Sequence, residues 1–395
     1  MKEQLLRYLE ATRTEQLQLL EKLVLQSSHS MDKIGVDRVG AMIREELFPC
    51  DLQLSVDHQD EYGDNLVFSS AACASLPAHL LLVGHMDTVF PRDSSFNFYR
   101  EDHIKAYGPG VCDMKGGLVT AIFLVKALHS CRLLKNIPLV FICNSDEEIG
   151  SPGSTALITR HARRSLCGLV FECGGTEGEV ATGRKGKAGF KLHILGKSGH
   201  AAFSQKTGKS SAILELAHKV IEVEKLNNPR KNIVVNVGRI SGGAAANVIA
   251  ENASAEIDIR FVTDDDGQFC LKSLQAIASQ STVSGTTGSL VPTNSRLPMM
   301  QTDDNLTLYY FFKKSAEQLG IPIKSELRSG VSDANTIAAC GIPVIDGLGP
   351  IGALDHSENE YILKDSLLQR CKLATLTTLE IWHHFSRTNV LTEPS

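Results

Sequence analysis

The chain lacks the charge excess and the long apolar segments that mark several specialised classes of protein. Lys and Arg total 40 against 45 for Asp and Glu, a formal net charge of only −5. Proteins that wrap nucleic acid or lie on a membrane need a basic face, so this balance argues against both, although a local basic patch stays compatible with it. No segment approaches the ~20 apolar residues that span a bilayer. The amino-terminal stretch also lacks the apolar region of a signal peptide. We therefore expect a cytoplasmic protein with no nucleic-acid and no membrane partner.

The chain also lacks any Cys-x-x-Cys pair, although it contains ten cysteines. This absence argues against a zinc ribbon and against a thioredoxin-type site. Most of the cysteines lie inside apolar runs such as Val140–Cys143, so we expect reduced, buried thiols. At ~150 residues per domain, 395 residues predict two to three domains, each able to fold without disulfides.

What the chain does contain is a regular alternation of strand and helix patterns. In the first part, apolar strands are predicted at 80–83, 138–143 and 169–171, with helices predicted at 118–128 and 153–161. Such alternation indicates a parallel or mixed doubly wound sheet covered by helices. From about Met299 the alternation returns, with helices at 306–319, 335–340 and 366–384 and a strand at 343–345.

The segment that lies between these two parts has a different pattern. After about Thr182 we predict a strand, a helix, two strands, a helix and a strand, at 190–195, 212–223, 233–237, 255–262, 269–278 and 289–291. This order is the ferredoxin-like arrangement. We therefore predict an α/β fold: a catalytic domain with a doubly wound mixed sheet, formed by residues 1–182 and 297–395. An inserted ferredoxin-like α+β domain, residues 183–296, would interrupt it as a lid or dimerisation domain.

Ligand-type side chains follow the predicted strands of the first part. The strand at 80–83 runs into His85 and Asp87, and the next strands run into Asp146-Glu147-Glu148 and Glu172. A Gly-Pro-Gly turn brings Asp113 to the start of a helix. Each residue alone has an ordinary explanation, such as a helix cap or a solvated helix start. In open α/β sheets, ligands bind at the carboxyl ends of the strands. The recurrence of His, Asp and Glu side chains after successive strands therefore favours their convergence on a divalent ion, and zinc is the first candidate.

Five motifs occur in order along the chain: Gly84-His85-Met86-Asp87-Thr88, the segment Gly108–Gly117, Asp146–Ser151, Ser198-Gly199-His200-Ala201 and Asp355-His356-Ser357. Together they resemble the di-zinc metallopeptidase and aminoacylase family. This family includes glutamate carboxypeptidase (the carboxypeptidase G2 type), aminoacylase, acetylornithine deacetylase and succinyl-diaminopimelate desuccinylase. The glutamate carboxypeptidase branch is the one that the motifs resemble most.

The resemblance implies two zinc ions per subunit, with Co²⁺ or Mn²⁺ as other candidates. Their ligands would be Asp113 bridging both ions, His85 and Glu172 on one, and Glu148 and His356 on the other. Asp87 would hold the His85 imidazole in its metal-binding tautomer. Glu147 would be the general base for the water between the metals. Two zinc ions, three carboxylates and one hydroxide sum to zero charge, which leaves Glu147 free for proton transfer.

The resemblance also implies roles in the inserted domain. His200 lies in a Gly-containing loop and would stabilise the tetrahedral oxyanion. In one arrangement that the resemblance implies, this histidine reaches the active site from the partner subunit of a homodimer. Asn247 would hydrogen-bond the substrate, and Arg296 would pair with its terminal carboxylate. Val331 stands where the family often has glycine, which leaves the substrate open.

The implied function is zinc-dependent, carboxypeptidase-like hydrolysis of an amide bond. It would release a glutamate-type C-terminal amino acid from an N-acyl amino acid or short peptide. The alternatives are an N-acetyl- or N-succinyl-amino-acid deacylase and a catalytically silent metal-binding relative.

Overall fold

The computed structural model describes residues 1–204 and 208–387, and the chain divides into two compact units. Unit 1 contains Met1–Gly183, Gln301–Leu327 and the described residues from Ser332 onward. Unit 2 contains Arg184–Met300 and Arg328–Val331. The functional assignment of the segments 1–182, 183–296 and 297–395 remains a prediction, and each unit is described below by itself.

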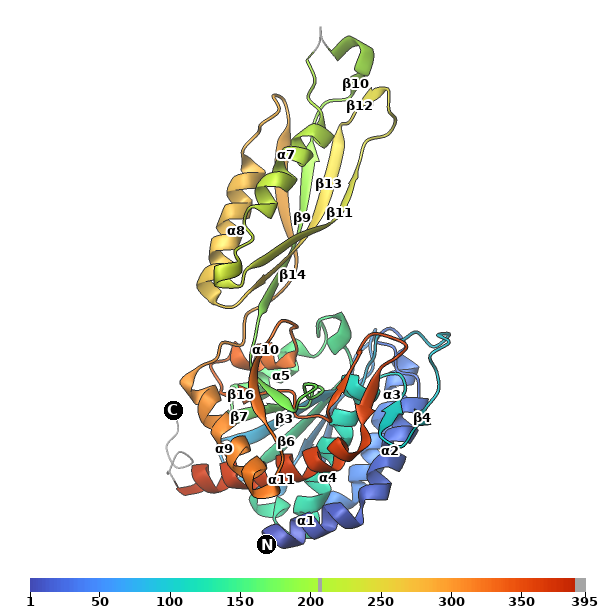
Figure 1. The fold of residues 1–395 in the computed structure, drawn as a ribbon, viewed down its shortest axis with the longest axis vertical. Coiled ribbons are helices and arrows are strands. Elements are labelled where there is room, and N and C mark those ends of the chain that lie inside the picture. Colours follow the sequence, from blue (N-terminus) through green and yellow to red (C-terminus); the bar gives the residue numbers. More distant parts are fainter. Residues whose placement is uncertain (205–207, 388–395) are drawn as a thin grey trace. The chain divides into compact units, whose positions relative to one another are not determined.

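Unit 1 is built on a six-stranded mixed sheet (Figure 1). Its strand order is β1 (Gln53–Asp57), β2 (Asn65–Ser69), β6 (Leu139–Asn144), β3 (His79–His85), β7 (Ser165–Val170) and β16 (Val344–Ile345). The strand β3 runs parallel to both β6 and β7, whereas β1 and β2 are antiparallel. Every residue of β3, β6 and β7 is buried, which explains why these strands read as continuous apolar runs in the sequence. The prediction of a mixed, doubly wound sheet is confirmed.

Helices cover the sheet of unit 1 (Figure 1). They are α1 (Lys2–Ala11), α2 (Arg13–Leu25), α3 (Lys33–Leu47), α4 (Gly116–Ser130), α5 (Thr155–Ala162), α9 (Asp303–Leu319), α10 (Asp333–Ala338) and α11 (Lys364–Arg387). Almost all of α4 is buried, and α4 packs against α11 and the amino-terminal helices. The helices predicted at 118–128, 153–161, 306–319 and 366–384 are therefore confirmed. None of the described helices is long and apolar enough to cross a membrane.

Two smaller sheets complete unit 1. One has the order β17 (Gly352–Ala353), β18 (Tyr361–Leu363), β5 (Lys105–Tyr107) and β4 (Arg100–Glu101), and it flanks the loop that carries His356. The other pairs β8 (Glu179–Arg184) with β15 (Lys324–Arg328). The strands β4, β5 and β15 are short and at least partly exposed, so they lack the apolar pattern that would predict them from the sequence, whereas β8 is largely buried.

Unit 2 has the predicted β-α-β-β-α-β order (Figure 1). Its elements are β9 (Gly186–Leu195), α7 (Ala212–Glu224), β11 (Val234–Gly242), β13 (Asn252–Phe261), α8 (Asp264–Ser279) and β14 (Thr287–Arg296). The sheet is antiparallel with the order β11-β13-β9-β14. Each helix begins with a side-chain cap, because Ser211 and Thr263 accept backbone N–H groups of the first turn. The ferredoxin-like prediction is thus confirmed.

Candidate metal centre

His85 is the last residue of β3, and its side chain is 1% exposed. Its Nε2 lies 3.0 Å from Asp113 Oδ1 and 3.7 Å from Glu172 Oε1. Its Nδ1 lies 3.0 Å from the backbone oxygen of Asp87 and 3.3 Å from Asp87 Oδ1. The imidazole is therefore held on one ring nitrogen by Asp87 and offers the other nitrogen to two carboxylates.

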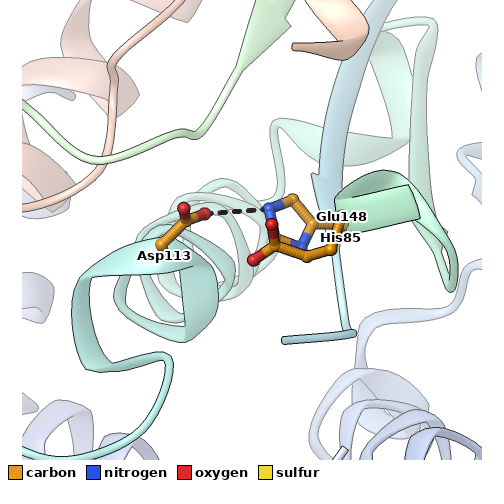
Figure 2. A group of neighbouring side chains, drawn as sticks. All are labelled: His85, Asp113 and Glu148. Atoms are coloured by element: carbon orange, nitrogen blue, oxygen red, sulfur yellow. Dashed lines mark hydrogen bonds and ion pairs between the residues drawn. The ribbon is translucent and has the colours of Figure 1, made fainter. Parts of the chain in front are cut away.

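Asp113 reaches this imidazole from a turn that precedes α4 (Figure 2). Gly108 and Gly110 both have positive φ, 156° and 73°, which explains the glycines of the Gly-Pro-Gly motif. The peptide bond between Asp113 and Met114 is cis. The second carboxylate oxygen of Asp113 lies 3.2 Å from His356 Nε2. Burial acts to raise the pKa of Asp113, but its hydrogen bonds to His356 and His85 hold that pKa well below the usual range.

Glu148 and Glu172 complete a group of three carboxylates, of which Glu172 is buried and Asp113 and Glu148 are partly buried. Glu148 Oε2 lies 3.1 Å from His356 Nε2, and Figure 2 shows Glu148 facing His85 and Asp113. Burial and then the charge of Asp113 raise the pKa of Glu148 and that of Glu172 to about 7. The ion pairs of the three carboxylates are with His85 and His356. The structure therefore brings together the five residues predicted as metal ligands.

This set of donors fits divalent cations. Glu148 Oε1 is buried and has no hydrogen-bond partner among the described residues, which is costly for an acceptor that no cation reaches. Hydrogen bonds to Asp113 and Glu148 raise the pKa of His356 to about 11, so the two carboxylates create a strongly cation-attracting environment at this ring. Imidazole nitrogen and carboxylate oxygen are zinc ligands, and a ligand atom of each of His85, Asp113 and Glu148 lies within 4.8 Å of the others.

Glu147 lies beside these ligands, grouped with His85 and Glu172 within the same 4.8 Å. Its backbone N–H donates to Asp87 Oδ1 at 3.1 Å, and the N–H of Glu148 donates to Asp87 Oδ2 at 3.2 Å. Asp87 thus fixes the loop that carries both glutamates in addition to contacting His85.

Several residues that support the site were missed by the sequence analysis. Ser30 donates to Asp87 Oδ2 at 2.6 Å, and Asp333 accepts from Asn144 Nδ2 at 2.7 Å and from Ser151 Oγ at 2.6 Å. Glu360 accepts three backbone N–H groups from the turn that carries Asp113. Their partners lie between 57 and 250 residues away, so no local pattern points to them.

The residues predicted to stabilise the oxyanion, His200, and to bind substrate, Asn247 and Arg296, belong to unit 2. The placement of His200 in a loop is wrong: it lies in the short strand β10 (Gly199–His200), opposite Val248 of β12 (Val248–Ile249). Its exposed ring accepts the Ala202 N–H at 3.2 Å. Asn247 is its neighbour, because the Asn247 carbonyl accepts the N–H of the next residue, Ala201, at 3.0 Å.

Arg296 lies elsewhere in unit 2. It pairs with Lys187 at the start of β9, whereas His200 follows Leu195 at the end of that strand. At ~3.3 Å per residue, the eight residues from Lys187 to Leu195 span roughly 26 Å. The structure therefore brings His200 and Asn247 together and places Arg296 at the opposite end of the sheet.

Known proteins share both the sequence pattern and the fold. Residues 81–380 match the peptidase family M20/M25/M40. Carboxypeptidase G2 of Pseudomonas sp. (strain RS-16) is 28% identical over 379 residues, 92% of this chain and 89% of the carboxypeptidase. Succinyl-diaminopimelate desuccinylase of Pseudomonas syringae pv. tomato is 27% identical, over 73% of this chain and 78% of the desuccinylase.

Among solved structures, aminopeptidase PepT of Bacillus cereus has a TM-score of 0.76 at 21% identity, covering 93% of this chain and 98% of the aminopeptidase. This likeness supports the fold, while the match to the family covers most of the chain and all five residues of the candidate metal centre. The chain therefore belongs to peptidase family M20/M25/M40 and is a metallohydrolase.

Proposed function

We propose that the chain is a di-zinc, carboxypeptidase-like enzyme that releases a glutamate-type C-terminal amino acid from an N-acyl or peptidyl group. The observation that carries this proposal is the convergence of three carboxylates and two imidazoles at 3.0–3.7 Å. Asp113 contacts both imidazoles and so would be the residue that bridges the two ions. His85 and Glu172 would complete one site, and Glu148 and His356 the other.

Two zinc ions at this centre would acidify a water molecule and polarise the scissile carbonyl. Glu147 takes the proton from the attacking water and later delivers it to the leaving amine. Asp87 supports this transfer because it binds the Glu147 backbone and the His85 ring at once. Water exclusion is aided by the burial of Glu148 and Glu172.

The substrate would be held by unit 2. Arg296 pairs its planar guanidinium with the terminal carboxylate of the substrate, and Asn247 hydrogen-bonds the substrate. His200 stabilises the oxyanion. Arg296 pairs with Lys187 at the start of β9 and His200 lies beyond Leu195 at its end, and these two ends of the strand are roughly 26 Å apart, too far for one small substrate to reach both residues in one chain. This separation supports a homodimer in which each active site takes His200 and Asn247 from the second copy.

A second candidate is a deacylase of N-acetyl or N-succinyl amino acids. It is favoured by the similarity to succinyl-diaminopimelate desuccinylase over most of both chains. The same centre would perform this reaction, since only the acyl group and the amino acid differ.

The two candidates are separated by a substrate panel on the zinc-loaded protein. It should contain N-acyl-glutamates and glutamate-terminated dipeptides on one side, and N-acetyl and N-succinyl derivatives of basic amino acids on the other. We expect the larger kcat/KM for the first set. A larger kcat/KM for the second set would establish the deacylase, and no hydrolysis of any member by protein carrying two zinc ions would overturn both.

A further inference from the structure

Glu360 is a fully buried carboxylate outside the proposed ligand set. It lies four residues after His356, in the loop that leads into β18. Its Oε2 accepts the Gly110 N–H at 2.9 Å, and its Oε1 accepts the N–H groups of Cys112 at 2.7 Å and Asp113 at 2.9 Å. A glutamate side chain is rarely buried this completely unless it holds something in place.

The turn that Glu360 binds needs glycine at position 110, so its conformation has to be held by contacts from outside the turn. Gly110 has φ 73°, and a Cβ at this position would lie 2.5 Å from Thr88 Cγ2. The turn precedes the regular part of α4, and the N–H groups of Gly110, Cys112 and Asp113 donate to Glu360, whereas the Lys115 N–H donates to the Gly110 carbonyl within the turn. The carboxylate of Glu360 thus supplies the acceptors for three N–H groups of the turn, and hydrogen bonds from backbone amides to a carboxylate are among the stronger ones in proteins.

These bonds also connect the two segments that meet at the centre. Asp113 and His356 lie 243 positions apart in the sequence, yet Asp113 Oδ2 is 3.2 Å from His356 Nε2. Glu360 belongs to the His356 loop and binds the Asp113 backbone directly. One side chain therefore fixes the position of the bridging carboxylate relative to a ligand of the second metal.

We propose that Glu360 is a positioning residue that holds the Asp113 turn in the geometry needed to bridge two metal ions. This inference rests on the proposed function, because it concerns the bridging ligand of that site. Glu360 contacts neither the substrate nor the metals. It acts through three backbone N–H groups.

Two substitutions at Glu360 and one matched control test this role. In Glu360→Gln the amide oxygen still accepts from Cys112 and Asp113, whereas the NH₂ group faces the Gly110 N–H. Glu360→Ala removes all three acceptors. The control is Glu358→Gln, the same chemical change two residues earlier, where the side chain is exposed and accepts from Ser95 Oγ at 2.9 Å.

The first measurement is hydrogen exchange of the peptide containing residues 110–115 in the metal-free proteins. We expect exchange to be fastest in Glu360→Ala, intermediate in Glu360→Gln, and unchanged in the control. This measurement needs neither metal nor substrate, so it tests Glu360 even where the proposed function fails. Unchanged exchange in Glu360→Gln, which conserves the shape of the side chain and should fold, would overturn the inference.

The second measurement is zinc affinity, by competition with a chelator of known affinity. Supporting residues of metal sites typically change affinity by about 10- to 100-fold. We expect a loss of about tenfold for Glu360→Gln and about 100-fold for Glu360→Ala, with kcat lowered more than KM is raised. A merely structural role would lower the melting temperature and leave zinc affinity and kcat within twofold of the wild type, and this result would overturn the inference. The proposed function fails separately, if the wild type binds two zinc ions and hydrolyses nothing.

Discussion

Gly117, the second residue of α4, lies so close to the strand end that carries Glu172 that an added methyl group has no room. A Cβ at Gly117 would lie 1.7 Å from the Phe171 carbonyl oxygen and 2.8 Å from its carbonyl carbon. Ordinary contacts begin near 3.4 Å, so either the helix or the strand end must move by roughly 1.5 Å to accept alanine. Both obstructing atoms belong to the backbone, so rotation of a side chain cannot relieve the contact.

The expected cost of Gly117→Ala is at least as large as that of overpacking a core, about 1–3 kcal/mol. The higher helix propensity of alanine returns at most about 1 kcal/mol and less at a helix terminus. We therefore expect a net loss of about 2 kcal/mol or more. Because Glu172 follows Phe171 directly, the same displacement should also weaken zinc binding.

The assay is urea unfolding of metal-free Gly117→Ala beside Gly40→Ala, with chelator competition for zinc. Gly40 is also buried within a helix, but a Cβ there would meet only side-chain atoms, Leu66 Cδ1 at 3.3 Å and Met86 Sδ at 3.5 Å. We expect the stability of the control to stay within about 1 kcal/mol of the wild type. If Gly117→Ala were as stable as the control and bound zinc normally, the close approach of α4 to the Glu172 strand would be refuted.

Three further predictions follow from the buried charges of unit 1. Burial, and then the charges of His161 and Arg164, lower the pKa of His79 to about 4 from 6.5. As the pH falls, the unfolded chain therefore takes up a proton on His79 before the folded chain does. The free energy of unfolding, fully present above pH 6.5, should decrease by about 2 kcal/mol between pH 7 and pH 5. Urea unfolding of His79→Gln should show a smaller decrease over the same pH range. Asp87→Ala removes the acceptor of two N–H groups in the Glu147 loop, so kcat should fall about 10- to 100-fold while circular dichroism shows a folded protein; an unchanged kcat would contradict this role. Removal of zinc by a chelator should lower the melting temperature, and added zinc should restore it, since the bound metal stabilises the folded state by mass action; equal melting temperatures would argue against a metal at this centre.

The sequence was sufficient to predict those helices and strands whose apolar pattern lies within their own consecutive residues. The strand β3 is buried along its whole length and the helix α4 along almost all of it, so their composition alone indicates central elements of a helix-covered sheet. Alternating burial in β13 likewise reveals a strand with one covered face. The proposed ligands His85 and Glu172 could be anticipated because they lie at or just after the carboxyl ends of parallel strands of one sheet.

The remaining features depend on contacts between distant segments. The strand β1 is half exposed without regular alternation, so nothing in its sequence separates it from a loop. The strand at His200 exists only because Val248 and Ile249 pair with it. Glu360 follows a run of polar residues in the sequence, Ser357 to Asn359, and it is buried where the turn at Gly110 folds onto it. Such residues become visible only in three dimensions.

The central claim is that Glu147 moves the proton while neighbouring residues hold the metals. The most direct test is to measure zinc content and turnover of Glu147→Gln beside the wild type, on the best substrate of the panel. We predict two zinc ions per chain in both proteins and a loss of kcat of about 10²- to 10⁴-fold in the variant, the usual contribution of general acid–base catalysis. Full turnover by the zinc-loaded variant would contradict the account.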